Sequence, residues 1–185
     1  MRHLLIDPTQ PARLYAAVQA EPETASGLYG SDDGGRHWVR LGTGTIGTVR
    51  SLSLCEPAGT LYVLANSQPG GGYFAPRTLW RSDNHGRSWA KLDERLAACA
   101  AVHPHDANRV YLVAWAGDVS REQVNVYRSL DGGKTWTAIA DNIPLTPGGE
   151  GNQVLFDPVD PSRFFVLHNS GTFEGIDPVA EANRR

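Results

Sequence analysis

An eight-residue motif occurs three times in this chain, and this repetition constrains the fold more than any other feature. The copies span Ser31–Trp38, Ser82–Trp89 and Ser129–Trp136 and share the pattern Ser-x-Asp/Asn-x-Gly-x-(Ser/Thr/His)-Trp. They lie roughly 50 residues apart, a period that is typical of propellers and other repeat arrays. We therefore expect a series of similar structural units, each packed against the next.

A second repeat alternates with the first. Ile6–Tyr15, Val102–Tyr111 and Phe156–Phe165 each contain an apolar residue, a proline-marked turn and a second apolar segment, and Leu54–Tyr62 is a shorter version. Each unit is therefore expected to form four short antiparallel strands separated by Pro, Gly, Asp and Asn. Because four-stranded sheets repeated radially form a β-propeller, we predict an all-β propeller.

The predicted blades are residues 1–48, 49–97, 98–150 and 151–185 of a single domain, and the last of them is irregular. Asp177 falls at the Asp position of the motif, but no Gly stands at the fifth position and no Trp at the eighth. We therefore expect about three and a half to four blades, an incomplete propeller. Because an open arc leaves apolar sheet faces uncovered, we expect further blades from a second copy or from a longer chain.

The motif is predicted to be structural and to join the third and fourth strands of each blade. Its Asp or Asn oxygen can accept backbone N–H groups within the turn, and its Gly permits positive φ. Its Trp is expected to fold back between sheets and to be largely buried. The spacing and final Glu of a calcium loop are missing, so no metal site and no cofactor is assigned. The residues given this structural role are Ser31, Asp33, Gly35, Trp38, Ser82, Asn84, Gly86, Trp89, Ser129, Asp131, Gly133 and Trp136.

The motif resembles the Asp-box, or bacterial neuraminidase repeat, of sialidases, sortilin-type receptors, xyloglucanases and photosystem II assembly factors. The proline pattern that begins at Ile6 is most similar to that of the sortilin, xyloglucanase and assembly-factor branch. The resemblance extends to about Asp177 and implies a propeller whose boxes lie on the outer rim, away from the binding face. The chain has no counterpart of the Phe-Arg-Ile-Pro segment of sialidases or of the catalytic Asp segments of xyloglucanases, so the resemblance assigns no catalytic residue.

Charge and hydropathy exclude some classes of partner. The chain has 185 residues and a formal net charge of −3, which offers no electrostatic attraction to nucleic acid or to an anionic membrane. No apolar run has membrane-spanning length, and Met1–Pro8 does not have the form of a secretory signal. The sequence as written therefore predicts a cytoplasmic protein, an expectation that lapses if it is a piece of a longer secreted protein.

The candidate binding face is the end of the blades opposite the boxes, where the loops vary most in length and composition. Aromatic platforms beside arginines suit recognition of carbohydrate or of protein and peptide. The candidate binding residues are Tyr73, Phe74, Arg77, Trp115, Arg121 and Arg50. Arg77 is expected to lie on a mobile loop stem.

Two classes of function remain open. We favour a non-catalytic recognition or assembly scaffold, because no catalytic segment is matched. The alternative is a sialidase- or xyloglucanase-like glycoside hydrolase, or a fragment of one, with Asp118, Glu122 and Glu150 as weak catalytic candidates. Such an enzyme needs two carboxyl groups about 5 Å or about 6.5–9.5 Å apart.

The cysteines and histidines are expected to be structural or solvated. Cys55 and Cys99 are predicted to be buried free thiols that point to opposite sheet faces. His103 and His105 flank a proline in a turn, where we expect solvent exposure in preference to a metal site. His85 occupies a variable motif position and is likewise expected to be exposed.

Overall fold

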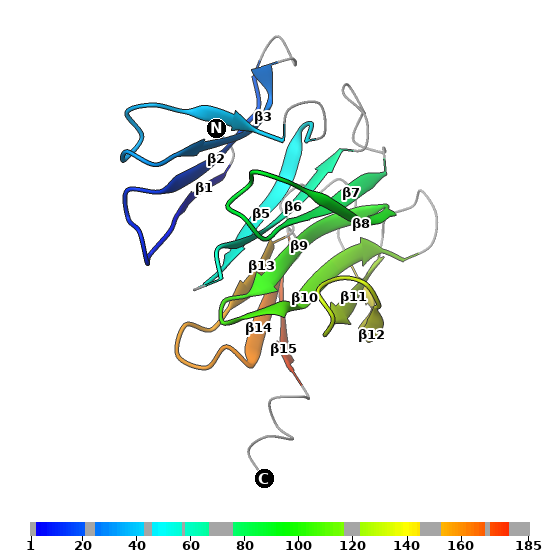
Figure 1. The fold of residues 1–185 in the computed structure, drawn as a ribbon. Coiled ribbons are helices and arrows are strands. Elements are labelled where there is room, and N and C mark those ends of the chain that lie inside the picture. The colour runs from blue at the N-terminus through cyan, green and yellow to red at the C-terminus, as the bar shows by residue number, and fades with distance from the viewer. Residues whose placement is uncertain are drawn as a thin grey trace.

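The structure, a computed structural model, describes residues 3–20, 25–42, 46–56, 58–66, 76–116, 123–144, 153–168 and 171–177. Within these ranges the chain forms four antiparallel sheets that follow one another in space as they do in sequence (Figure 1). The fold is therefore all-β, and it confirms the predicted incomplete β-propeller. The described part of the chain contains no helix with the length and apolarity needed to cross a bilayer.

Among the described residues, three sheets have four strands and the last has three, each in sequential order. The first contains β1 (His3–Ile6), β2 (Leu14–Val18), β3 (Gly27–Ser31) and β4 (Val39–Leu41). The second contains β5 (Val49–Cys55), β6 (Thr60–Asn66), β7 (Arg77–Ser82) and β8 (Ala90–Arg95). The third contains β9 (Ala97–His103), β10 (Asp106–Trp115), β11 (Gln123–Ser129) and β12 (Thr137–Pro144). The fourth contains β13 (Gln153–Phe156), β14 (Arg163–His168) and β15 (Gly171–Ile176).

Strand register shows that the sheets are structural repeats of one another. The apolar residue that ends the proline turn pairs with the box serine in the first three sheets, and with Gly175 in the fourth. These pairs are Leu14–Ser31, Leu61–Ser82, Val110–Ser129 and Phe164–Gly175. The same apolar residues pair on their other side with Ile6, Leu54, Val102 and Phe156, which confirms that these four positions are equivalent.

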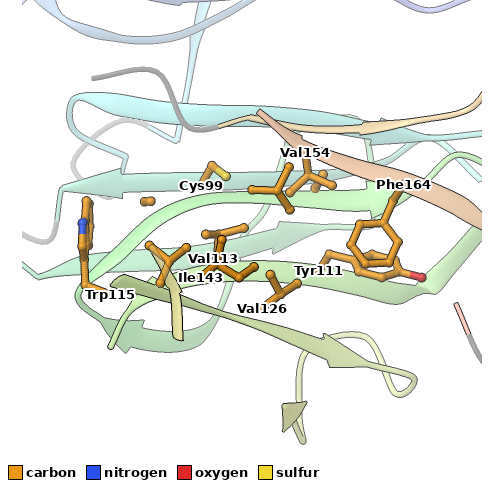
Figure 2. Close-up of a cluster of buried hydrophobic side chains, with 12 residues drawn as sticks. Cys99, Tyr111, Val113, Trp115, Val126, Ile143, Val154 and Phe164 are labelled. Atoms are coloured by element: carbon orange, nitrogen blue, oxygen red, sulfur yellow. The ribbon is translucent and has the colours of Figure 1, made fainter. Parts of the chain in front are cut away.

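The core consists of three apolar clusters, one at each junction between successive sheets. The junctions are built around the first strands, because β5 contacts both β1 and β9, and β9 also contacts β13. Figure 2 shows the cluster between the third and fourth sheets, where Tyr111 and Val113 of β10 face Val154 and Phe164. Alternate residues of each strand therefore serve alternate junctions, as the two-residue period of a strand requires.

Both cysteines are buried and free, as predicted. Each belongs to the cluster between its own sheet and the next, so the prediction of opposite faces was wrong. The prolines that follow the two cysteines do not mark equivalent positions. Strand register makes Cys99 equivalent to Ser51, which lies an even number of residues before Cys55. Residues an even number apart on a strand point to the same face, so both thiols lie on the same sheet face. Burial raises the pKa of Cys55 to about 11 and that of Cys99 to about 12, so both are protonated at neutral pH.

The outer faces of the first and last sheets are apolar and, within the described ranges, no other sheet covers them. Leu4 and Ile6 are 49% and 56% exposed on the first sheet, and Leu155 and Ile176 are 41% and 52% exposed on the last. The positions of the inner sheets that the register makes equivalent to Leu4, Ile6 and Leu155 include Leu52, Val102 and Ala101, and these three are buried. Each end of the arc therefore presents a surface that has the composition of a blade junction.

The box tryptophans show the same effect. Trp89 and Trp136 are half-buried because they pack on the clusters shared with the preceding sheets. Trp38 belongs to the first sheet, where no described sheet precedes it, and it is 38% exposed. The prediction that all three rings are largely buried was therefore wrong for Trp38, because the burial of each ring depends on a neighbouring sheet.

Candidate functional site

The box carboxylates are bonded within their own hairpins. Asp33 accepts the backbone N–H of His37 at 2.9 Å and the hydroxyl of Ser31 at 2.8 Å. Asp131 accepts the backbone N–H of Thr135 at 2.8 Å. These backbone N–H groups, followed by side-chain hydrogen bonds, hold the pKa of both carboxyl groups well below the usual range. The contacts support a structural role for the boxes, since the carboxylates already have the donors that a ligand would have to replace.

At the opposite end of the sheets, Arg77 is a buried residue at the start of β7. Its side chain is only slightly exposed, and Nη1 donates to the carbonyl oxygens of Ala97 at 2.5 Å and Ala98 at 2.9 Å. Its guanidinium also lies over the Trp115 ring, 5.0 Å from the ring centroid. Arg77 therefore joins the second sheet to the third, and the expectation of a mobile stem at this position was wrong.

Arg50 lies at the same end and is half-buried. Its Nε donates to Oδ1 of Asn66 at 3.0 Å, and its backbone carbonyl lies 3.0 Å from the ring nitrogen Nε2 of His3. Asn66 is buried and pairs with Arg77 in the β6–β7 ladder. The structure thus gathers Arg50, Arg77 and the buried Trp115 at the end of the strands opposite the boxes, fixed by contacts that involve three sheets. We call this end the loop end.

The other candidate residues of the loop end lie outside the described residues. They are Tyr73, Phe74, Asp118, Arg121, Glu122 and Glu150. The assignment of the candidate carboxyl groups therefore stays a prediction. Among the described residues no group of His, Cys, Asp and Glu is arranged to hold a metal ion.

Sequence reasoning missed a charged cluster at the box end of the third junction. The buried carboxylate of Asp177 pairs with the guanidinium of Arg128, accepts the hydroxyl of Tyr111, and lies 3.5 Å from Nη1 of Arg109. Burial and this hydrogen bond raise the pKa of Tyr111 above its usual range. Asp177 occupies the Asp position of the motif but connects two sheets. The sequence feature that could have indicated this cluster is a box Asp without the Gly and Trp of its motif.

At the first junction, His85 makes the contacts that Asp177 makes at the third: it approaches an arginine and a tyrosine of the preceding sheet. It has φ of 59°, whereas the other boxes have glycine there, at Gly34 and Gly132. Its Nδ1 lies 3.0 Å from Nη1 of Arg13 and 3.3 Å from the hydroxyl of Tyr15. Because arginine can only donate, Nδ1 accepts and the proton of the neutral ring is on Nε2. Burial, and then Arg13, lower the pKa of His85, which is half-buried and not exposed as expected.

His103 is also less accessible than predicted. Its ring is buried, 5.5 Å from the Phe156 ring centroid, and Nδ1 accepts the backbone N–H of His105 at 3.2 Å. Burial is the main cause that lowers the pKa of His103. The expected solvated turn is wrong for this residue because the fourth sheet packs against it.

Comparison with solved structures identifies similar folds. The chain resembles the GH74 xyloglucanase from Xanthomonas campestris with TM-score 0.65 and 20% identity, covering 92% of this chain and 27% of that one. It resembles the Niastella koreensis GH74 enzyme with TM-score 0.69 and 19% identity, covering 92% of this chain and 28% of that one. An ancestral GH74 enzyme gives TM-score 0.68 and 19% identity over 94% and 22% of the two chains. At these identities the likeness concerns the fold alone.

Comparison with curated sequences identifies a partial relative. The dispase autolysis-inducing protein of Streptomyces mobaraensis is 36% identical over 76 residues, which cover 38% of this chain and 20% of that protein. No family model matches the chain. The β-propeller fold is thus supported by solved structures, and membership of the Asp-box family stays a prediction. The chain spans well under two thirds of each of these proteins.

Proposed function

We propose that this chain is part of a non-catalytic β-propeller that recognises a protein partner through its loop end. The observation that carries the proposal is the fixed arrangement of Arg50, Asn66, Arg77 and Trp115 across successive sheets. Loops that rest on a rigid scaffold are favoured positions for binding residues. Arg50 is half-buried and held by Asn66, so it can contact a partner with little loss of side-chain entropy.

The partial relative favours a protein partner. It is named for inducing the autolysis of dispase, which is an effect on another protein. A shared segment at 36% identity makes dispase a reasonable first probe for this chain. A carbohydrate is the alternative partner, which the fold of the GH74 enzymes suggests.

The recognition proposal predicts that Arg50→Ala combined with Tyr73→Ala weakens binding of immobilised dispase at least about tenfold, because arginine and tyrosine are enriched among residues that dominate interfaces. Biolayer interferometry measures the affinity, and circular dichroism checks that the variant remains folded. Arg77 is left intact, since its replacement would remove the bonds to Ala97 and Ala98. The matched control is Arg36→Ala, an exposed arginine on the box rim. An equal loss in the control, or no binding by the unchanged chain, would contradict the proposal.

The competing function is glycoside hydrolysis. It requires an acid and a second carboxylate near one sugar linkage, for which Asp118, Glu122 and Glu150 are the candidates. A panel of chromogenic glycosides together with xyloglucan, assayed in the acidic range, tests it directly. Hydrolysis that is abolished by Asp118→Asn, Glu122→Gln or Glu150→Gln would replace the binding proposal with a catalytic one.

We further propose that additional sheets cover the two ends of the arc, supplied by a second copy or by a longer chain. The exposed apolar residues at both ends, including Ile6 and Leu155, support this proposal. The chain of 20.1 kDa, when isolated, is therefore expected to self-associate, and light scattering should report a larger mass. Ile6→Lys together with Leu155→Lys should reduce this association, because a charge on each face opposes burial. A monomer with a sharp cooperative melt would argue against an open arc.

A further inference from the structure

The two ends of the arc carry the two different halves of one junction. At each inner junction a tyrosine from the second strand of one sheet shares an apolar cluster with a residue from the second strand of the next. These pairs are Tyr15 and Leu61, Tyr62 and Val110, and Tyr111 and Phe164. Register places Phe165 at the tyrosine position of the last sheet, where it pairs with Leu155. It places Leu14 at the partner position of the first sheet, where it pairs with Ile6. We call the surface of Phe165 and Leu155 the forward face, and the surface of Leu14 and Ile6 the backward face.

A polar contact crosses each inner junction from one position of the first strand. Register identifies this position as His3, Ser51, Cys99 and Gln153 in the four sheets. The first of them contacts a carbonyl oxygen of β5, and Ser51 Oγ accepts the backbone N–H of Ala100 at 3.0 Å. The sulfur of Cys99 accepts the backbone N–H of Val154. Gln153 is exposed, and its amide can likewise accept or donate. The forward face therefore retains the hydrogen-bonding position of a junction as well as its apolar residues.

The charged residues of the forward face are arranged as they are inside a junction. Arg163 pairs with the carboxylates of Asp157 and Glu174. The equivalent arginine of the first junction, Arg13, is likewise beside two carboxylates. Arg163 also lies over the Phe165 ring, 5.9 Å from its centroid. The guanidinium is thus already compensated, and a neighbouring sheet could cover this face without isolating a positive charge.

We propose that two copies of this chain join head to tail through these faces and close a ring of eight sheets. The inference rests on the proposal that additional sheets cover both ends of the arc. One chain carries both halves of the junction, so the backward face of each copy can pack on the forward face of the other. The described part of the chain forms four sheets, and two copies give eight, within the range of about 4–8 blades that is typical of propellers.

Two contacts follow from this arrangement. Gln153 of one copy would lie beside the backbone N–H of Leu4 of the other, because Leu4 is the counterpart of Ala100 in the first sheet. Trp38 would gain the preceding sheet that packs against Trp89 at the first junction. Both contacts extend the repeat across the boundary between copies.

The test is the mass of the chain in solution, measured by light scattering after size exclusion. The unchanged chain should have twice the mass of one copy, which is 20.1 kDa. Each interface contains Ile6 from one copy and Leu155 from the other, so a single Ile6→Lys or Leu155→Lys change alters both interfaces. Either variant should raise the dissociation constant at least about a hundredfold, because each interface would bury an unpaired charge. Circular dichroism checks that each variant remains folded.

An equimolar mixture of the two single variants is the decisive sample. One interface then joins the unchanged backward face of the Leu155→Lys copy to the unchanged forward face of the Ile6→Lys copy, so dimers should form again. Val39→Lys is the matched control. Val39 is 67% exposed on the opposite face of the first sheet, so this change should leave the dissociation constant within about twofold.

Three results would overturn the inference, and each has a different meaning. If only one single variant weakens association, or the mixture stays monomeric, like faces pair with like, and the ends of the arc are covered in another way. Assemblies that grow beyond two copies with concentration would show an open array in place of a ring. A monomer at concentrations up to about 100 μM would leave a longer chain as the source of the additional sheets.

Discussion

We expect Asp177→Ala to lower the free energy of unfolding by about 3–5 kcal/mol, because it would remove the carboxylate that pairs with the nearly buried guanidinium of Arg128. The Asp177 side chain is fully buried, and the side chains of Arg109 and Arg128 are 14% and 10% exposed. The change would also remove the acceptor of the Tyr111 hydroxyl. Chemical denaturation followed by tryptophan fluorescence measures the effect.

Glu174→Ala provides the matched control for this prediction. Glu174 lies on β15, in the same sheet, and pairs with Arg163 at 2.5 Å, but both side chains are more than 40% exposed. Exposed ion pairs of this kind contribute about 0–1 kcal/mol. Equal losses in the two variants would show that Asp177 is not the buried link between the third and fourth sheets.

Gly175→Ser should destabilise the protein by about 1–3 kcal/mol, although it restores the box serine, because the added atoms would overpack a filled core. A β-carbon at Gly175 would lie 2.3 Å from Cζ of Phe164. The Phe164 ring is buried and its centroid lies 4.8 Å from that of the tilted Tyr111 ring, so it has little room to move. Denaturant unfolding measures the loss.

A double-mutant cycle separates overpacking from other causes. The first three sheets place Leu14, Leu61 or Val110 opposite the box serine, so a smaller residue at position 164 should accommodate the introduced serine. Phe164→Leu combined with Gly175→Ser should therefore be more stable than the sum of the single changes implies, by about 0.5–3 kcal/mol. Strict additivity would mean that the two positions do not compete for space.

Much of the fold was predictable because its signals are local. The turn chemistry of each box lies within eight residues, such as Ser31–Trp38, and the proline turns mark the other hairpin of each sheet. Together they predicted the strand order, the equivalence of Ile6 with Phe156, and the irregular fourth unit. The positions of Arg50 and Trp115 at the loop end also followed from this alternation of hairpins.

Burial across the junctions could not be predicted in the same way, because it depends on a neighbouring sheet distant in sequence. Arg77 was expected to be mobile, but the carbonyl oxygens of β9 hold it. Trp38 was expected to be buried, but its burial requires a preceding sheet that the described chain does not place there. Asp177 has a box position, yet its partners Arg109 and Arg128 belong to another sheet.

The sequence by itself therefore determined the repeating sheets, since hairpin turns and strand alternation are encoded by adjacent residues. Tertiary structure alone decided which polar groups the sheets enclose. His85 illustrates the difference: the sequence shows a histidine where the other boxes have glycine, but only the packing of the second sheet on the first places its ring against Arg13 and Tyr15. A charged or polar group that is buried between two sheets depends on partners that are distant in sequence, and its local motif does not specify them.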